Sequence, residues 1–333
     1  MLTAEKTRRL SSRTLTLALV LCCATGCATT KLFSWWPNRP IRCELTSEAS
    51  VEQIVAKLNE NVVPSWRSTD VRLTARQTGS IPVTLSAILA VQAPRRLRLI
   101  ATNSFGNNEF DLGSNDQRFW FWIRRAKPNY IVTVSYDDLP KVADQLQMPF
   151  QPEWFMEALG VVQLDPKNFS VEREPKKRRQ VRLVSQTQTL QGRPVRKVIT
   201  VDLCRGVIRE HALYDTNGQL LAKAAFSDYR RDPLTNVWLP HVIQLYAPPA
   251  GMQLTLRLGQ IEVNPVGIAS KTWELPTYPN SKIVDLASTP AFQARQAARS
   301  SPSTGRTTPW PSKQQTDSQS IQPVAGWRKS DLR

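Results

Sequence analysis

The fold is decided by residues 95–123, RRLRLIATNSFGNNEFDLGSNDQRFWFWI. Residues 97–102 alternate apolar and polar side chains, and this period of two predicts a half-buried β-strand. Residues 104–108 are rich in Gly and Asn, which adopt positive φ at low cost, and they predict a tight turn with the ring of Phe105 at its tip. The strand at residues 119–123 is aromatic on both faces, so neither face can be freely solvated. The stretch predicts three antiparallel strands that border a covered or lipid-facing cavity.

The period of two recurs on both sides of this stretch. Asn217-Gly218 is a strong signal for a hairpin turn between two alternating segments. Pro240 predicts an edge position or a bulge for its strand, and a shift in apolar phase at Gly259-Gln260 predicts a β-bulge. Further antiparallel strands are predicted at residues 70–76, 83–91, 130–136, 181–187, 195–203, 207–214, 219–226, 237–246 and 252–263.

Three segments predict helices. Residues 47–61 place four apolar side chains on one helical face, with Ser47 or Ser50 as the N-cap. Two short helices are predicted at residues 139–147 and 152–160, the second with a Pro near its start and a Gly at its end. Their apolar residues fit either a lid over one face of the sheet or an ordinary core. The predicted fold class is therefore α+β, an open antiparallel β-barrel or strongly curved sheet covered by a few α-helices.

The N-terminus has the pattern of a targeting segment. Basic residues precede a short apolar run at residues 15–23, which predicts a signal peptide over residues 1–26. The segment ends in Ala24-Thr25-Gly26-Cys27, which resembles the site at which bacterial lipoproteins are cleaved and lipidated. Lipidated Cys27 would anchor the protein to a membrane, because each buried CH₂ contributes about 0.8 kcal/mol. The alternative is an ordinary secretory peptide. Residues 27–47 are interpreted as a tether to a domain over residues 48–287.

Few residues are available for a metal site or a disulfide. Beyond the signal peptide and Cys27, the chain has only Cys43 and Cys204, and an oxidising compartment would permit a disulfide between them. The chain has two histidines, and beyond the signal peptide it has no CxxC spacing. We therefore expect no metal site and no cofactor.

Charge divides the chain into three parts. Of the formal net charge of +17, the predicted signal peptide and the tail from Ser288 carry +3 and +5, which leaves +9 on the body. Lipid headgroups or cell-wall polymers are the expected anionic partners, and nucleic acid is not expected. The densest basic cluster of the body is Lys176, Lys177, Arg178 and Arg179, in a predicted hairpin turn that is either solvated or in contact with headgroups. Residues 288–333 are rich in Ser, Thr, Pro and Gln and predict disorder.

Sequence patterns of the common enzyme classes are absent. The sequence contains no GxSxG, GxGxxG, GxxxxGKS/T or HExxH pattern. Asp111 and Asp116 flank a predicted turn and are interpreted as turn formers rather than as a catalytic pair. We expect the protein not to be an enzyme.

Three motifs follow one another in the opening stretch: Arg98-Leu99, then Phe105-Gly106, then Glu109-Phe110-Asp111-Leu112. In this order they resemble the bacterial lipoprotein-localisation (LolA/LolB-like) superfamily, in its outer-membrane lipoprotein receptor branch. There, a short loop carries a protruding Leu before a Gly, and Phe105 occupies that position here. The resemblance covers about residues 48–265. The chain departs from the family in Ser104, where Pro is frequent, in the basic turn and in the C-terminal tail.

The resemblance implies an open barrel whose apolar concavity receives the acyl chains of a lipoprotein. It implies a monomer that is lipid-anchored in the envelope, at the outer membrane facing the periplasm, with a lipoprotein carrier as a possible partner. Phe105 and Gly106 are then the membrane-insertion loop. The alternative is a structural or interaction lipoprotein whose basic turn and tail bind anionic polymers. The residues predicted to line the cavity are Leu97, Leu99, Phe110, Leu112, Phe119, Trp120, Phe121, Trp122, Leu254 and Leu256.

Overall fold

The structure is a computed structural model that describes residues 43–146, 152–189 and 191–289. The predicted signal peptide, Cys27, nearly all of the predicted tether and the tail from residue 290 lie outside the described residues. The helices of the described part are α2 (Val51–Asn59), α3 (Leu139–Leu146) and α4 (Pro152–Ala158).

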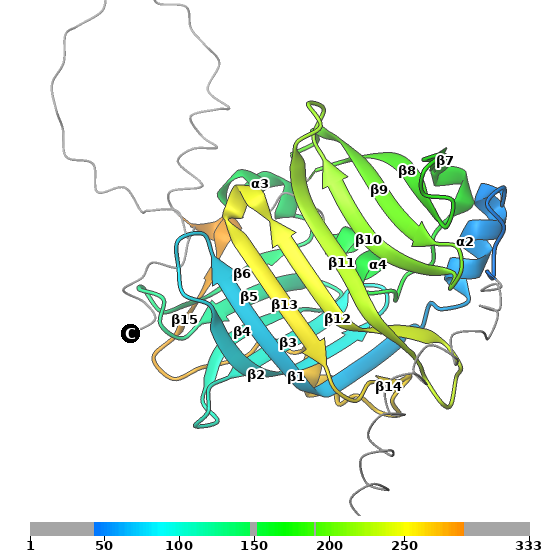
Figure 1. The fold of residues 1–333 in the computed structure, drawn as a ribbon. Helices are drawn as coiled ribbons and strands as arrows, with labels where there is room; N and C mark the ends of the chain where they lie inside the picture. The colour runs from blue at the N-terminus through cyan, green and yellow to red at the C-terminus, as the bar shows by residue number, and fades with distance from the viewer. Residues whose placement is uncertain (1–42, 147–151, 190, 290–333) are drawn as a thin grey trace, which may run out of the picture. The chain divides into compact units, whose positions relative to one another are not determined.

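One sheet of 15 strands dominates the described residues (Figure 1). Its order is β15-β6-β5-β4-β3-β2-β1-β13-β12-β11-β10-β9-β8-β7, with β14 paired to β1, and β15 with β6 is the one parallel pair. The end strands β15 and β7 do not pair with each other, so the described sheet is open and the predicted fold class is confirmed. The strands are β1 (Ser65–Gln77), β2 (Val83–Gln92), β3 (Arg96–Thr102), β4 (Asn108–Ser114), β5 (Arg118–Ile123), β6 (Tyr130–Ser135), β7 (Ser170–Arg173), β8 (Gln180–Gln188), β9 (Pro194–Asp202), β10 (Val207–Tyr214), β11 (Leu220–Arg231), β12 (Trp238–Ala247), β13 (Met252–Leu258), β14 (Glu262–Val263) and β15 (Lys282–Asp285).

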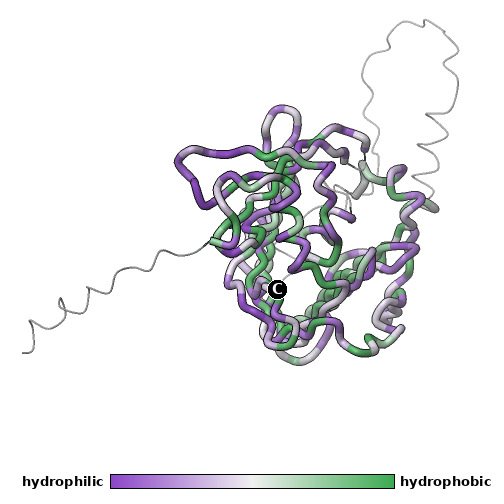
Figure 2. Tube along the Cα trace, turned by 90° about the vertical axis from the view of Figure 1, so that its right-hand side faces the viewer, coloured by the Kyte–Doolittle hydropathy of each residue, from purple (hydrophilic) through white to green (hydrophobic). Residues whose placement is uncertain are grey.

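The opening stretch forms the meander β3–β4–β5. Leu99 lies opposite Leu112, which lies opposite Phe121, so one row of side chains crosses all three strands. Green and purple segments alternate along much of the trace in Figure 2, as expected where hydrophobic and hydrophilic residues take turns along a strand. The sheet curves so that β3 and the strands β11–β13 contribute to one hydrophobic core. We call the face that lines this core the inner face and the opposite face the outer face.

Helix α2 packs on the strands β8 and β9. Its N-cap is Ser50, the second of the two predicted candidates, and Ser50 and Gln53 form a reciprocal capping box. Ile54, Val55 and Leu58 are buried against apolar residues of β8 and β9. Fully burying each side chain of this size contributes about 1.5–3 kcal/mol, so this apolar stripe fixes the helix on the sheet.

Helix α4 lies against the inner face (Figure 1). Trp154, Met156 and Leu159 are buried in the same core as Leu99 of β3 and Phe226 of β11. The indole Nε1 of Trp66 donates a hydrogen bond to the carbonyl of Leu159, at 3.1 Å. The predicted short helix therefore exists, and its apolar residues serve as both core and cover.

Two irregularities fall near their predicted positions but differ in kind. At the predicted bulge the strand is interrupted instead: β13 ends at Leu258, and β14 pairs with β1 again in the same register. The shift of register lies in the pairing of β1 with β2, between Ser68 and Val71. A Cβ at Gly259 would lie 2.3 Å from Oδ2 of Asp70, so glycine allows the Asp70 side chain to approach the backbone closely here. Pro240 lies in β12, which is a central strand between β11 and β13. At Pro240 itself the strand pairs with β11 alone, without a shift of register, because its pairing with β13 begins at Val242. The predicted edge position therefore holds locally, and the alternative of a bulge does not.

We call residues 264–289 the C-terminal strap, and its residues 272–278 lie on the outer face of β3–β6. Near its end lies β15, which pairs in parallel with β6, and a short 3-10 helix, Leu286–Ser288, follows β15 directly. Leu275 and Tyr278 pack on Trp120, Trp122 and Ile131 of the sheet. The sequence did not predict this element, because the strap carries no alternation of apolar and polar residues.

Candidate functional site

Phe105 lies at the tip of the β3–β4 turn with 89% of its surface exposed. The side-chain Oδ1 of Asn103 accepts hydrogen bonds from the backbone N–H groups of Phe105 and Asn107, at 3.0 and 3.1 Å. Its Nδ2 donates to Glu109 at 2.6 Å. Gly106 has a φ of 78°, which a residue with a Cβ adopts only with strain. The turn is therefore held by its own hydrogen bonds while it presents an aromatic ring to solvent.

The β5–β6 turn adds positive charge beside this ring. The backbone N–H of Arg124 donates to the carbonyl of Glu109, at 3.0 Å, and Nε of Arg125 donates to the carboxylate of Glu109, at 3.2 Å. Both guanidinium groups remain more than 40% exposed. Glu109 also accepts a hydrogen bond from the turn that carries Phe105. Its carboxylate therefore connects this turn to Arg124 and Arg125 of the β5–β6 turn.

The ten residues predicted to line a cavity divide into three groups. Phe119 and Phe121 pack with α3. Trp120 and Trp122 face the opposite way, under the C-terminal strap. The aromatic strand β5 thus contacts a helix on one face and the strap on the other. The remaining six belong to the core of the inner face, which α4 covers: Leu97, Leu99, Phe110, Leu112, Leu254 and Leu256.

Polar side chains interrupt the apolar inner face on three adjacent strands. Ser185 of β8 lies directly opposite Lys197 of β9, and His211 of β10 lies opposite Ile199, two residues further along β9. Glu157 of α4 reaches this point: its Oε2 lies 2.8 Å from Nζ of Lys197 and 3.9 Å from Nε2 of His211. We call Ser185, Lys197, His211 and Glu157 the inner polar cluster.

His211 is fully buried in this cluster. Neither ring nitrogen has a hydrogen-bond partner among the described residues, and the ring of Trp154 lies 5.3 Å away, centroid to centroid. Burial lowers the pKa of His211 well below its usual 6.5, and the positive charge of Lys197 lowers it further. The imidazole is therefore neutral at pH 7. No sequence motif marks this cluster, although Lys197 lies in phase with the apolar residues of its strand.

A second buried charged group lies on the outer face, and we call it the outer clamp: Arg98, Asp111 and Tyr278. The guanidinium of Arg98 donates to Asp111 at 2.7 Å and to the carbonyls of Thr272 and Glu274 at 3.2 and 2.8 Å. The hydroxyl of Tyr278 also donates to Asp111. Burial raises the pKa of Tyr278, and its bond to Asp111 raises it further. These contacts tie the C-terminal strap to β3 and β4.

Aromatic rings complete the outer clamp. The Tyr278 ring stacks on Trp122 with centroids 3.8 Å apart, and the Arg98 guanidinium lies 5.2 Å from the ring centroid of Trp120. The interpretation of Asp111 as a turn former is wrong, because this residue is fully buried inside β4. Asp116 does lie in the β4–β5 turn, and Arg96 binds it.

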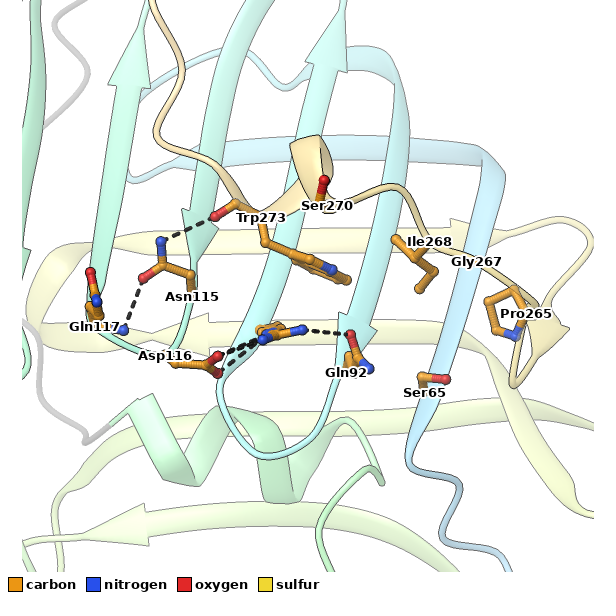
Figure 3. A pocket seen from close by; sticks show the side chains of 11 residues that line it. Ser65, Gln92, Asn115, Asp116, Gln117, Pro265, Gly267, Ile268, Ser270 and Trp273 are labelled. Carbon is orange, nitrogen blue, oxygen red and sulfur yellow. Dashed lines mark hydrogen bonds and ion pairs between the residues drawn. The ribbon is translucent and has the colours of Figure 1, made fainter.

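A polar cleft of about 510 Å³ lies between the C-terminal strap and the β2–β3 and β4–β5 turns (Figure 3). Arg96 lines the cleft and donates to Asp116 at 2.6 Å and to Gln92 at 3.5 Å. The side chain of Asn115 donates to the carbonyl of Trp273 and so links the cleft to the strap. None of the predicted cavity-lining residues borders this cleft, so it is distinct from the inner face.

The basic residues at 176–179 lie in the turn between β7 and β8, as predicted, and all four are exposed. Lys177 forms an ion pair with Glu174 at 3.0 Å. Following the antiparallel register from strand to strand, this turn and the turn of Phe105 lie at opposite ends of the strands. A strand of nine residues spans about 30 Å, so these two predicted membrane contacts form separate surfaces.

Cys43 and Cys204 are both disulfide-bonded, and their pairing with each other stays a prediction. Within the described ranges, no group of three His, Cys, Asp or Glu side chains is arranged to hold a metal ion. No helix in that part of the chain is long and apolar enough to span a membrane.

Comparison with known proteins finds similarity at the level of structure. No family model matches the sequence, and no curated protein matches it. The chain is similar to a LolA superfamily protein of Nitrosomonas europaea (8% identity, TM-score 0.41, covering 66% of this chain and 96% of that chain). It is also similar to a putative outer membrane lipoprotein-sorting protein domain of Vibrio parahaemolyticus (12%, 0.45, 68% and 97%). A third similar structure is a DUF1329 family protein of Desulfovibrio piger (12%, 0.43, 67% and 95%).

Proposed function

We propose that the protein binds acyl chains of lipids or lipoproteins on the inner face of its sheet, for transfer to or retention at a membrane. The proposal rests on the way in which helix α4 covers that face. Helix α4 is seven residues long, and among the described residues no backbone hydrogen bond joins it to a strand. Its buried side chains Trp154 and Met156 fill the face instead. An acyl chain can replace them, because apolar contact stabilises either occupant by about 25 cal/mol per Å².

The exposed ring of Phe105 supports a role at a membrane. An isolated aromatic side chain at a fixed turn can enter the interfacial layer without unfolding the sheet. Arg124 and Arg125 beside it are placed to contact anionic headgroups. With Cys27 lipidated, the protein is anchored in the envelope, at the outer membrane facing the periplasm. Binding and transfer need no chemical step, and the proposed role is not enzymatic.

Displacement of α4 tests this proposal. The full chain with Cys27→Ser, which removes the predicted acyl chains of its own anchor, is titrated with a fluorescent long-chain fatty acid. Hydrogen exchange is then measured with and without the saturating probe. We expect saturable binding and faster amide exchange over residues 152–160, because the helix leaves the inner face. Absence of binding, or binding that leaves the exchange of these residues unchanged, contradicts the proposal.

The exposed basic turn favours a second candidate function, binding of anionic cell-wall or membrane polymers. The four cations at residues 176–179 are exposed in the β7–β8 turn and need no cavity. Binding of this kind weakens with salt, because exposed charges are screened. Neutralising the turn with Gln at all four positions should abolish salt-sensitive retention on cell-wall material. Retention that persists in this variant removes the turn from the function.

A further inference from the structure

The inner polar cluster breaks an otherwise apolar surface. The neighbours of Lys197 and His211 on the inner face include Val195, Ile199 and Leu213, all nearly or fully buried. A cation on such a surface is costly to bury unless a counter-charge accompanies it. The sheet itself supplies none at this position: the carboxylate in contact with Lys197 comes from α4.

Glu157 therefore neutralises the charge of Lys197, and the oxyanion of a ligand can do the same. Its Oε2 is 2.8 Å from Nζ of Lys197, and its side chain remains 23% exposed, whereas Lys197 is only 12% exposed. When α4 leaves the inner face, Glu157 leaves with it into solvent, while Lys197 stays on β9. A ligand with only apolar atoms would leave this ammonium group without a counter-charge, with the ring of Phe169, whose centroid is 5.2 Å from Nζ, as its remaining partner. A ligand with an acidic head would replace the carboxylate in the same place.

His211 supplies a second, independent indication of a ligand at this position. It is fully buried, both of its ring nitrogens are without a hydrogen-bond partner in the described structure, and Nε2 lies 3.9 Å from Oε2 of Glu157. Buried polar atoms without partners are uncommon in folded proteins. A neutral imidazole N–H can donate to an oxyanion that approaches more closely than Glu157 does.

We propose that the inner face takes an anionic amphiphile, a long acyl or alkyl chain with an oxyanion head, and that Lys197 and His211 bind that head in place of Glu157. In the protein without ligand, the Glu157 carboxylate occupies the position of the ligand's head, and the apolar side chains of α4 occupy the position of its chain. We call these two positions the head site and the chain site. This inference rests on the proposed function and narrows its ligand class.

Three ligands with the same 16-carbon chain test the head site: palmitate, hexadecyl phosphate and neutral hexadecanol. Their affinities are measured by displacement of a fluorescent fatty acid from the full chain with Cys27→Ser. We expect palmitate or hexadecyl phosphate to bind about tenfold more tightly than hexadecanol, the size of effect that a hydrogen bond to a charged group produces. The tighter of the two acids identifies a carboxylate or a phosphate head.

Two substitutions separate the head site from the chain site. Lys197→Met should bring the affinities for acid and alcohol within twofold of each other. Glu157→Gln should tighten all three ligands while keeping the preference for acid, because Lys197 then lacks a partner before binding. The control is Lys223→Met, which removes a lysine paired with Glu210 in the hairpin β10–β11 and should change nothing.

The outcomes distinguish this inference from the proposed function. If none of the three ligands binds the unsubstituted chain, the proposed function fails. If all three bind with equal affinity, or if Lys197→Met keeps the preference for acid, acyl binding stands and the head site is refuted. A loss of the preference in Lys197→Met with hexadecanol affinity retained supports it.

Discussion

The inner polar cluster and the outer clamp both bury charge against the same sheet, but they satisfy it differently. Arg98 binds one carboxylate and two backbone carbonyls, and Asp111 accepts from both Arg98 and Tyr278. Lys197 has one carboxylate partner, on a helix of seven residues, and the adjacent His211 has no hydrogen-bond partner in the described structure. We infer from this difference that the ion pair of the outer clamp, which has several neighbouring hydrogen-bond partners, stabilises the fold. The ion pair of the inner polar cluster, whose carboxylate a ligand can replace, indicates a binding site.

The largest loss of stability is expected from breaking the outer clamp. Asp111→Ala leaves Arg98 buried without its counter-charge and should cost about 3–5 kcal/mol in the free energy of unfolding, measured with urea. The double replacement Arg98→Met with Asp111→Leu should cost less, because no unpaired charge remains. A loss below about 1 kcal/mol in Asp111→Ala would contradict a fold-fixing role for the clamp.

A pH-dependent loss of stability is expected from the inner polar cluster. The pKa of His211 is lowered in the folded protein, so the unfolded chain binds its proton more readily. Stability is therefore full above about pH 6.5 and falls as the pH drops below that value, by at most about 1.4 kcal/mol per unit. Thermal unfolding between pH 7.5 and 5 measures this fall. His211→Gln should make the profile flatter; an identical profile would remove His211 as its cause.

A smaller loss is expected when the partner on α4 is removed. Glu157→Ala should lower the free energy of unfolding by about 1 kcal/mol or less, because its carboxylate is partly exposed and its ion pair is screened by solvent. The comparison with Asp111→Ala is direct, since both changes delete the acid of an ion pair, a fully buried acid in one case and a partly exposed acid in the other. Equal losses of unfolding free energy in the two variants would contradict the proposed difference between the outer clamp and the inner polar cluster.

The smallest effect on stability is expected at the exposed turn. Phe105→Ser should change the free energy of unfolding by less than about 0.5 kcal/mol, because the ring makes few contacts. It should nevertheless slow transfer of a bound acyl probe to anionic vesicles. The control is Leu234→Ser, an equally exposed apolar residue in the β11–β12 turn at the other end of the strands. Equal slowing by both substitutions would show that position along the strand does not matter.

Local pattern predicted much of the sheet and the helix α4 that covers its inner face, but not the C-terminal strap. The alternation in residues 97–102 and the Asn217-Gly218 turn depend on neighbours in sequence, and both strands and hairpin are confirmed. The C-terminal strap pairs with β6 across about 150 residues and has no periodicity, so no local signal reveals it.

The candidate site was predicted in part for the same reason. Six of the predicted lining residues share the inner core because alternation assigns them to one face. The inner polar cluster combines residues from α4, β8, β9 and β10, and only the fold brings them together. Lys197 in phase with Ile199 is a signal of this site in the sequence, because a cation on an apolar strand face requires a counter-charge from another element.

The most direct test of the account is a measurement of what occupies the inner face when the protein is isolated. The full chain with Cys27→Ser is purified without added lipid, and its mass is measured under native conditions, followed by extraction and identification of any bound molecule. We expect an acyl-chain lipid with an acidic head, released when excess palmitate is added. A bare polypeptide mass, together with failure to take up palmitate, would contradict the claim that the inner face binds acyl chains.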